Sequence, residues 1–212
     1  MNKIELIKAE KDGLKIKNDI QRFAEQGWES ISEEDIQRLK WYGLFLRNPT
    51  PGYFMLRVRI PNGFSTSHQV RMLSCLAETY GNGVIDITTR QQVQLGHLKI
   101  ENIPQVFNLL QEVGLTTSQT GMDNVRNIVG CPVAGLNPKE KVNAHLLIKE
   151  LNEHILGNPE FSNLPRKFNI TLSGCLDDCV HAETQDLALV PAIEEMGGRS
   201  VYGFNVLVGG KL

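Results

Sequence analysis

The sequence predicts an α+β protein made of two units that follow one another along the chain. Between residues 53 and 129 the pattern reads strand, helix, strand, strand, helix, strand, which is a βαββαβ unit. From Gly130 it changes to a loop of small residues, one long helix and three further strands. With 212 residues, 41% of them hydrophobic, the chain is long enough to bury a sizeable core.

Residues 1–47 are expected to form an N-terminal helical segment. Ser32 and Asp35 have a spacing similar to that of a helix-capping box, and a short helix through Leu39 should follow. The run Asn48-Pro49-Thr50-Pro51-Gly52 predicts a turn that separates this segment from the next unit.

Residues 48–120 are expected to form a ferredoxin-like half-domain. Apolar and polar side chains alternate strictly over residues 53–60, so one face of this first strand should be buried. The elements expected after it are a helix capped by Ser65 or Thr66 with the core face Val70, Leu73, Leu76 and Ala77, strands at 84–89 and 93–100, a helix capped by Asn102, and a strand at 125–129.

Residues 121–212 should form the second unit. Asn137 is expected to cap a helix from residue 139 to about 156, and strands should follow at 168–173, 187–190 and 204–208. The last strand leads only into a Gly-Gly turn. We therefore expect the chain to be the N-terminal portion of a longer protein.

Composition argues against several classes of protein. The net charge is -2, the pI is near 6.2, and there is no run of Lys and Arg, so no nucleic-acid partner is expected. The N-terminus is too polar for a signal peptide, and no apolar run reaches membrane length. We expect a protein of the cytoplasm or plastid stroma, without membrane insertion and with reduced cysteines.

Cationic side chains lie on or beside several predicted strands, and they are candidates for an anion site. They are Arg57, Arg59, Arg90, Arg126, Arg166 and Lys167. Each alone is typical of a solvated surface. If the strand ends converge, they would form a pocket for a carboxylate-rich or phosphate-rich ligand or a small oxyanion, because guanidinium binds such groups bidentately. Neither glycine-rich nucleotide-binding motif is present.

The cysteines allow two interpretations. Cys175 and Cys179 form a C-x-x-x-C pair after a strand and could supply two ligands of an iron–sulfur cluster. A second pair is missing, because Cys131 has no near partner in the sequence and Cys75 is expected to be a small core residue of a helix. The alternative is that the pair consists of small residues in a tight loop.

Five segments together resemble the siroheme-containing nitrite and sulfite reductases. They are FMLRVRIPNG (54–63), TTRQQVQ (88–94), GMDNVRNIVGCPVAG (121–135), LPRKFNITLSGC (164–175) and HAETQDLALVPA (181–192). The resemblance covers about residues 20–212, and the ferredoxin-dependent nitrite reductases of cyanobacteria fit best. It implies that residues 121–212 are the first part of a mixed-sheet siroheme-binding domain, within one half of a pseudo-twofold fold.

The resemblance also implies a function, an assimilatory reductase that converts nitrite to ammonia. Electrons would come from reduced ferredoxin through a [4Fe–4S] cluster and siroheme, in a full-length monomer. The residues implied to bind the siroheme are Arg57, Arg59, Arg90, Arg126 and Lys167. Those implied to act on nitrite are Arg57, Arg126, Lys167 and Asn169.

The cluster ligands would lie in a second half of the protein, so no metal ligand is expected in this chain. On this interpretation Cys175 and Cys179 are an echo of the cluster site left by duplication. Lys167-Phe168-Asn169 stands where sulfite reductases usually have K-x-K, which favours singly charged nitrite. The alternatives are a ferredoxin-dependent sulfite reductase and a non-catalytic tetrapyrrole- or anion-binding module.

Overall fold

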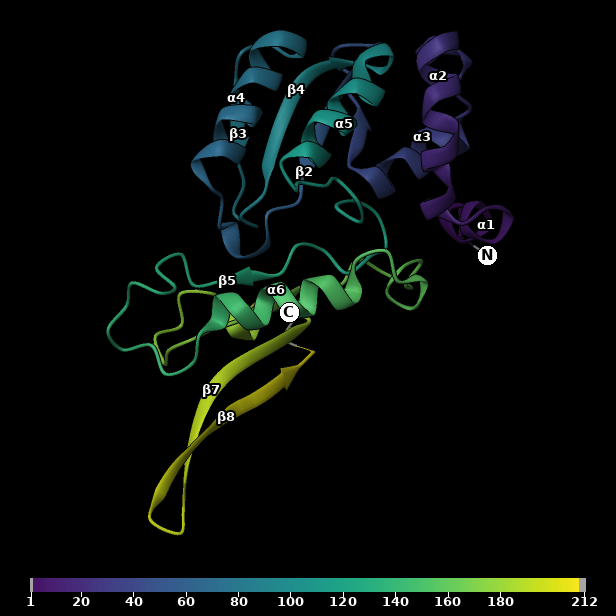
Figure 1. Cartoon of the computed structure of the whole chain (residues 1–212). Helices are drawn as coiled ribbons and strands as arrows, with labels where there is room; N and C mark the ends of the chain where they lie inside the picture. The colour runs from purple at the N-terminus through teal and green to yellow at the C-terminus, as the bar shows by residue number, and fades with distance from the viewer. Residues whose placement is uncertain (1, 210–212) are drawn as a thin grey trace.

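The computed structural model describes residues 2–209, which fold into two units around separate sheets (Figure 1). The α-helices are α1 (Lys3–Glu10), α2 (Ile20–Gln26), α3 (Glu33–Leu39), α4 (Ser67–Tyr80), α5 (Ile103–Glu112) and α6 (Ala144–Ile155). The strands are β1 (Leu44–Leu46), β2 (Tyr53–Val58), β3 (Ile85–Ile87), β4 (Val93–Lys99), β5 (Val129–Gly130), β6 (Ile170–Leu172), β7 (Leu187–Met196) and β8 (Arg199–Val208).

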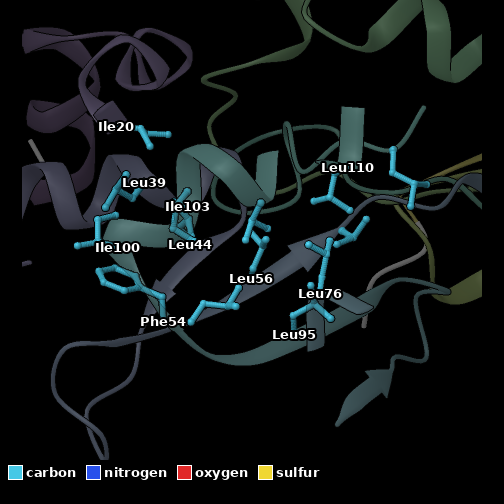
Figure 2. Close-up of a cluster of buried hydrophobic side chains, with 14 of the residues drawn as sticks. Ile20, Leu39, Leu44, Phe54, Leu56, Leu76, Leu95, Ile100, Ile103 and Leu110 are labelled. Carbon is cyan, nitrogen blue, oxygen red and sulfur yellow. The ribbon is translucent and has the colours of Figure 1, made fainter. Parts of the chain in front are cut away.

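The first unit is an antiparallel sheet of order β1-β2-β4-β3, with α4 and α5 packed on one face (Figure 1). Strand β2 alternates between buried and partly buried residues, as its sequence predicts. The core between sheet and helices is apolar and includes Phe54, Leu56, Leu76, Leu95, Ile103 and Leu110 (Figure 2). The α+β prediction with a ferredoxin-like half-domain is therefore confirmed.

Two strands of this unit differ from the prediction. Residues 125–129 do not complete the first sheet; the only strand there, β5, belongs to the second sheet. The place beside β2 is taken by β1, which was expected to lie in the helical segment. The turn at residues 48–52 is consequently the connection of the β1–β2 hairpin within one sheet.

The helix ends of the first unit depend on local polar groups. Thr66 and Gln69 form the complete reciprocal capping box at the start of α4. Asn102 precedes α5 but makes no side-chain cap, and Pro104 occupies the first turn instead. Two side chains of α4 expected in the core, Val70 and Cys75, are exposed.

The second unit is a mixed sheet of order β5-β6-β7-β8, in which only β8 runs antiparallel to its neighbour. Helix α6 packs on it and begins at Ala144 with Asn143 as its cap, five residues later than predicted. Asn137 instead accepts a hydrogen bond from the Lys139 amide in a turn. Strands β7 and β8 are longer than expected and form a hairpin that extends away from the molecule (Figure 1).

Polar contacts that are at least partly buried join the two units. The Gln91 side chain donates to the Gly130 carbonyl at 2.8 Å and accepts from the Gly130 amide at 3.1 Å. The backbone amide of Asn62 donates to the Ile128 carbonyl at 3.0 Å. A Cβ at Gly130 would lie 2.0 Å from Asn62 Oδ1, so only glycine allows this close approach. The arginine-bearing segments meet along this junction.

Candidate functional site: an arginine cluster at the junction of the two units

Arg57 and Arg126 come from different units and share one acceptor. Arg57 Nη1, on β2, donates to the Thr120 carbonyl at 3.2 Å, and Arg126 Nη1 donates to the same oxygen at 2.8 Å. Arg126 Nε also donates to the Met122 carbonyl at 2.9 Å. The Arg57 guanidinium lies over the Phe45 ring, 4.8 Å from its centroid. The local fold therefore holds two like charges close together.

Arg90 connects this pair with the segment that contains Lys167 and Asn169. It lies in the turn between β3 and β4, where Gln91 adopts a positive φ of 55°. Arg90 Nη1 donates to Asn169 Oδ1 at 2.5 Å. The backbone amide of Asn169 donates to Asp186 Oδ2 at 2.8 Å. The side chain of Asn169 is thus oriented by an arginine from the other unit.

The three arginines carry an unbalanced positive charge. Burial lowers the pKa of each; Arg90 further lowers that of Arg57, and Arg57 and Arg90 help to bring that of Arg126 to about 10. Asp186 raises the pKa of Arg90 and Asp123 that of Arg126, but neither forms an ion pair with them. Over residues 2–209, none of the three arginines has a carboxylate within ion-pair distance. A bound anion would relieve this repulsion.

Arg59 occupies a different position from the other three, because its side chain points into the junction and is only 1% exposed. Its Nε donates to Asn152 Oδ1 of α6 at 2.6 Å. Its Nη1 donates to the carbonyls of Gln119 and Val125, and its Nη2 to that of Arg126 at 3.0 Å. Every guanidinium nitrogen of Arg59 therefore has a protein acceptor, and the expected contact of Arg59 with a cofactor stays a prediction. Arg59 holds the backbone that carries Arg126.

Lys167 lies on the exposed loop before β6. The next residue is fixed to the Arg126 segment by two backbone hydrogen bonds, from the Phe168 amide to the Asn124 carbonyl at 3.0 Å and from the Arg126 amide to the Phe168 carbonyl at 2.9 Å. Lys167 is therefore next to a parallel bridge between Phe168 and Val125, the residue before Arg126. Arg166 is exposed beside it.

Three of the four cysteines lie near one another. Cys131 follows β5 and Cys175 follows β6, and these strands are parallel neighbours. Burial raises the pKa of the Cys131 thiol, and the thiols of Cys179 and Cys175 raise it further. Cys175 is buried and accepts from Asn137 Nδ2 at 3.4 Å, whereas Cys179 is exposed. Even so, residues 2–209 contain no group of three or more His, Cys, Asp or Glu side chains placed to hold a metal ion.

Comparison with known proteins matches each of the two units to a family model. Residues 47–113 match the family model of the nitrite/sulfite reductase ferredoxin-like half domain, and residues 121–212 match that of the nitrite and sulphite reductase 4Fe-4S domain. The chain belongs to the nitrite and sulfite reductase family.

Curated relatives of this family member include ferredoxin–nitrite reductases from cyanobacteria and plants. It is 49% identical to the protein of Leptolyngbya laminosa and 41% identical to the chloroplastic protein of Arabidopsis thaliana, in each case over 99% of its length. It covers 42% and 38% of those proteins. The chain therefore spans about two fifths of the length of the relatives it matches.

A solved structure has the same fold as this nitrite and sulfite reductase family chain. The Mycobacterium tuberculosis NirA protein superposes with a TM-score of 0.89 at 29% identity, over 99% of this chain and 41% of that one. Within the described part of the chain, no helix is long and apolar enough to cross a membrane.

The structure brings together most of the side chains that the sequence singles out in this family member. Arg57, Arg90, Arg126 and Asn169 meet at the junction, with Lys167 on the adjoining loop, whereas Arg59 lies behind them. The Thr120 carbonyl was not foreseen as the shared acceptor, because nothing in a sequence marks a backbone oxygen. Asp186 was also missed, although it directly precedes the predicted strand at 187–190.

Proposed function

We propose that this chain is the N-terminal part of an assimilatory ferredoxin-dependent nitrite reductase, which converts nitrite to ammonia with electrons from reduced ferredoxin. The observation that carries the proposal is the cluster of partly buried arginines that have no carboxylate partner among residues 2–209, in a chain 49% identical to a ferredoxin–nitrite reductase. A cluster of like charges at a domain junction is costly unless an anion binds there.

The residues present suit siroheme, the tetrapyrrole that the family implies. Its carboxylate groups would be held by Arg57, Arg90 and Arg126, because guanidinium groups pair with carboxylates bidentately. Arg57 Nε is buried and has no hydrogen-bond partner among residues 2–209, as expected of a donor left for a ligand. When bound, siroheme would supply the iron that receives electrons and ligates the substrate. The ligands of the [4Fe–4S] cluster would lie outside this chain.

The same side chains would orient nitrite and stabilise its negative charge. The amide oxygen of Asn169 accepts from Arg90, so its NH₂ group is the end that remains to donate to a substrate oxygen. Arg57 and Arg126 would add positive charge where the anion binds. Lys167 would donate protons from Nζ as the substrate oxygens leave as water.

Asn169 is the residue that distinguishes nitrite from sulfite in this proposal. A neutral amide provides one hydrogen bond without a further positive charge, which suits a singly charged anion better than a doubly charged one. A sulfite reductase of the same fold is the second candidate. We further propose that the full-length protein is a monomer of the cytoplasm or plastid stroma that acts in nitrate assimilation.

The experiment that tests the proposed function is a comparison of substrates with the full-length protein that contains this chain, purified with its cofactors. Reduced ferredoxin is oxidised in the presence of nitrite or sulfite, and kcat/KM is measured for each. We expect kcat/KM to be higher for nitrite. A higher value for sulfite would favour the sulfite reductase, and no turnover of either would favour a non-catalytic binding module.

A further inference from the structure

Lys8, a lysine of α1 with a buried side chain, contacts Asp123 and Leu164. These two residues precede the segments that carry Arg126 and Lys167. The side chain of Lys8, on α1, is only 6% exposed although it carries a charge. Its Nζ donates to Asp123 Oδ2 at 3.1 Å and to the Leu164 carbonyl at 2.9 Å, and it also pairs with Glu5. Leu164 in turn donates from its amide to the Asp123 carbonyl at 2.8 Å.

Each contact lies close in sequence to a residue of the proposed anion site. Asp123 is three residues before Arg126, and Leu164 is three residues before Lys167. Asp123 is also close enough to Arg126 to raise the pKa of its guanidinium. Its side chain is 19% exposed, so it is largely shielded from water that would otherwise weaken its charge.

We propose that Lys8 is a positioning residue that keeps Asp123 from neutralising Arg126, and so preserves the affinity of the arginine cluster for anions. The inference rests on the proposed anion-binding role of Arg126, but it does not depend on which anion is the physiological ligand. The carboxylate of Asp123 is the acidic group that acts on Arg126, and Lys8 is the cation bonded to that carboxylate.

Loss of the lysine charge would leave Asp123 poorly solvated and without its ion pair. A carboxylate in that situation lowers its free energy by turning toward the nearest cation, and Arg126 offers one. The charge available to an incoming anion would fall. Burial lowers the pKa of Lys8, but its hydrogen bonds and charge interactions with Glu5 and Asp123 raise it overall above the ordinary value of 10.5, so the lysine is charged at neutral pH.

The test uses two ligands with the full-length protein. One is nitrite, through KM and kcat of the cofactor-loaded enzyme. The other is uroporphyrin, a fluorescent tetrapyrrole with carboxylate side chains, titrated into protein prepared without siroheme. For Lys8→Met we expect the KM for nitrite and the Kd for uroporphyrin each to rise about tenfold, with kcat changed less than about twofold.

The decisive variant is the double substitution Lys8→Met with Asp123→Asn. It removes the competing carboxylate, so both values should return to within about threefold of the original protein. A purely structural role for Lys8 predicts no such rescue. The matched control is Lys3→Met on the same helix, because Lys3 pairs with Glu33 on the exposed surface and should leave both values unchanged.

A further variant separates charge from hydrogen bonding and guards against misfolding. Lys8→Gln can still donate hydrogen bonds to Asp123 and the Leu164 carbonyl, yet we expect it to weaken binding about as much as Lys8→Met. Unchanged binding in Lys8→Gln, or a double variant as weak as Lys8→Met, would overturn the inference. Absence of nitrite turnover in the unsubstituted protein would instead count against the proposed function, and the uroporphyrin titration would still test Lys8.

Discussion

Arg57 and Arg126 donate to one and the same oxygen, the carbonyl of Thr120, at 3.2 and 2.8 Å. Arg57 lies on β2 of the first unit, and Arg126 lies shortly before β5 in the second unit. The Thr120 carbonyl accepts hydrogen bonds from both guanidinium groups, but it is a neutral dipole and leaves their two positive charges uncompensated. The position of these two residues explains why a separate anion should bind at the junction.

Arg126 should be more important for turnover than Arg166, the exposed arginine of the loop before β6. We expect Arg126→Gln to lower kcat/KM for nitrite about a hundredfold, because it removes a charged donor from the proposed site. Steady-state kinetics of the full-length enzyme measure the effect. Arg166→Gln is the control, and its kcat/KM should stay within about threefold of the original value.

Arg59 should matter chiefly for stability. Arg59→Met would leave the carbonyls of Val125 and Arg126 and the Asn152 side chain without their donor, at a cost of about 3 kcal/mol or more. Denaturant unfolding monitored by circular dichroism gives the free energy. Arg22→Met is the control, because Arg22 forms an exposed pair with Asp19 that should contribute less than about 1 kcal/mol. Equal losses in the two variants would contradict the buried role of Arg59.

Asn169 should control the choice between nitrite and sulfite. Asn169→Lys replaces the acceptor of Arg90 with a second cation, which repels Arg90 and favours a doubly charged anion. We expect the ratio of kcat/KM for sulfite to that for nitrite to rise at least about tenfold. Asn169→Gln keeps a neutral amide and should leave the ratio nearly unchanged. A constant ratio in both variants would show that selectivity resides elsewhere.

The cysteines should differ in reactivity according to their burial. At pH 8, iodoacetamide should alkylate Cys75 and Cys179, which are exposed, well before Cys131 and Cys175. Burial raises the pKa of the Cys131 thiol above the ordinary 9.0, so little of it is thiolate at pH 8 and its labelling should stay slow until the pH is raised well above 9. Peptide mass spectrometry measures each site.

The same labelling tests whether Cys175 and Cys179 hold iron. Removal of the iron–sulfur cluster from the full-length protein should leave their labelling rates unchanged, because the cluster ligands are proposed to lie outside this chain. A large increase at both cysteines after iron removal would show that they are ligands.

Local patterns in the sequence were sufficient to predict much of the fold. The alternation in β2 identified its buried face, and Thr66, one of the two residues expected to cap the following helix, does cap α4. Strand β1 was missed because three residues are too few to show a period, and its pairing with β2 depends on the turn between them. Helix α6 was predicted to start too early, because Asn137 has the chemistry of a cap but uses it in a turn.

The site was predictable in its chemistry but not in its geometry. The sequence identified the cations, since arginines beside strands and glycines are visible in it. It could not reveal that Arg59 would turn inward, because the compensating group is Asn152 on a distant helix. The part played by Lys8 was hidden for the same reason, since Asp123 and Leu164 lie far from it along the chain.

The most direct test of the anion site is a crystal structure of the full-length protein with its cofactors and nitrite. We expect oxygen atoms of the tetrapyrrole carboxylates or of nitrite to lie about 3 Å from guanidinium nitrogens of Arg57, Arg90 and Arg126. A tetrapyrrole and nitrite bound elsewhere, with these three arginines facing only water and protein, would contradict the account.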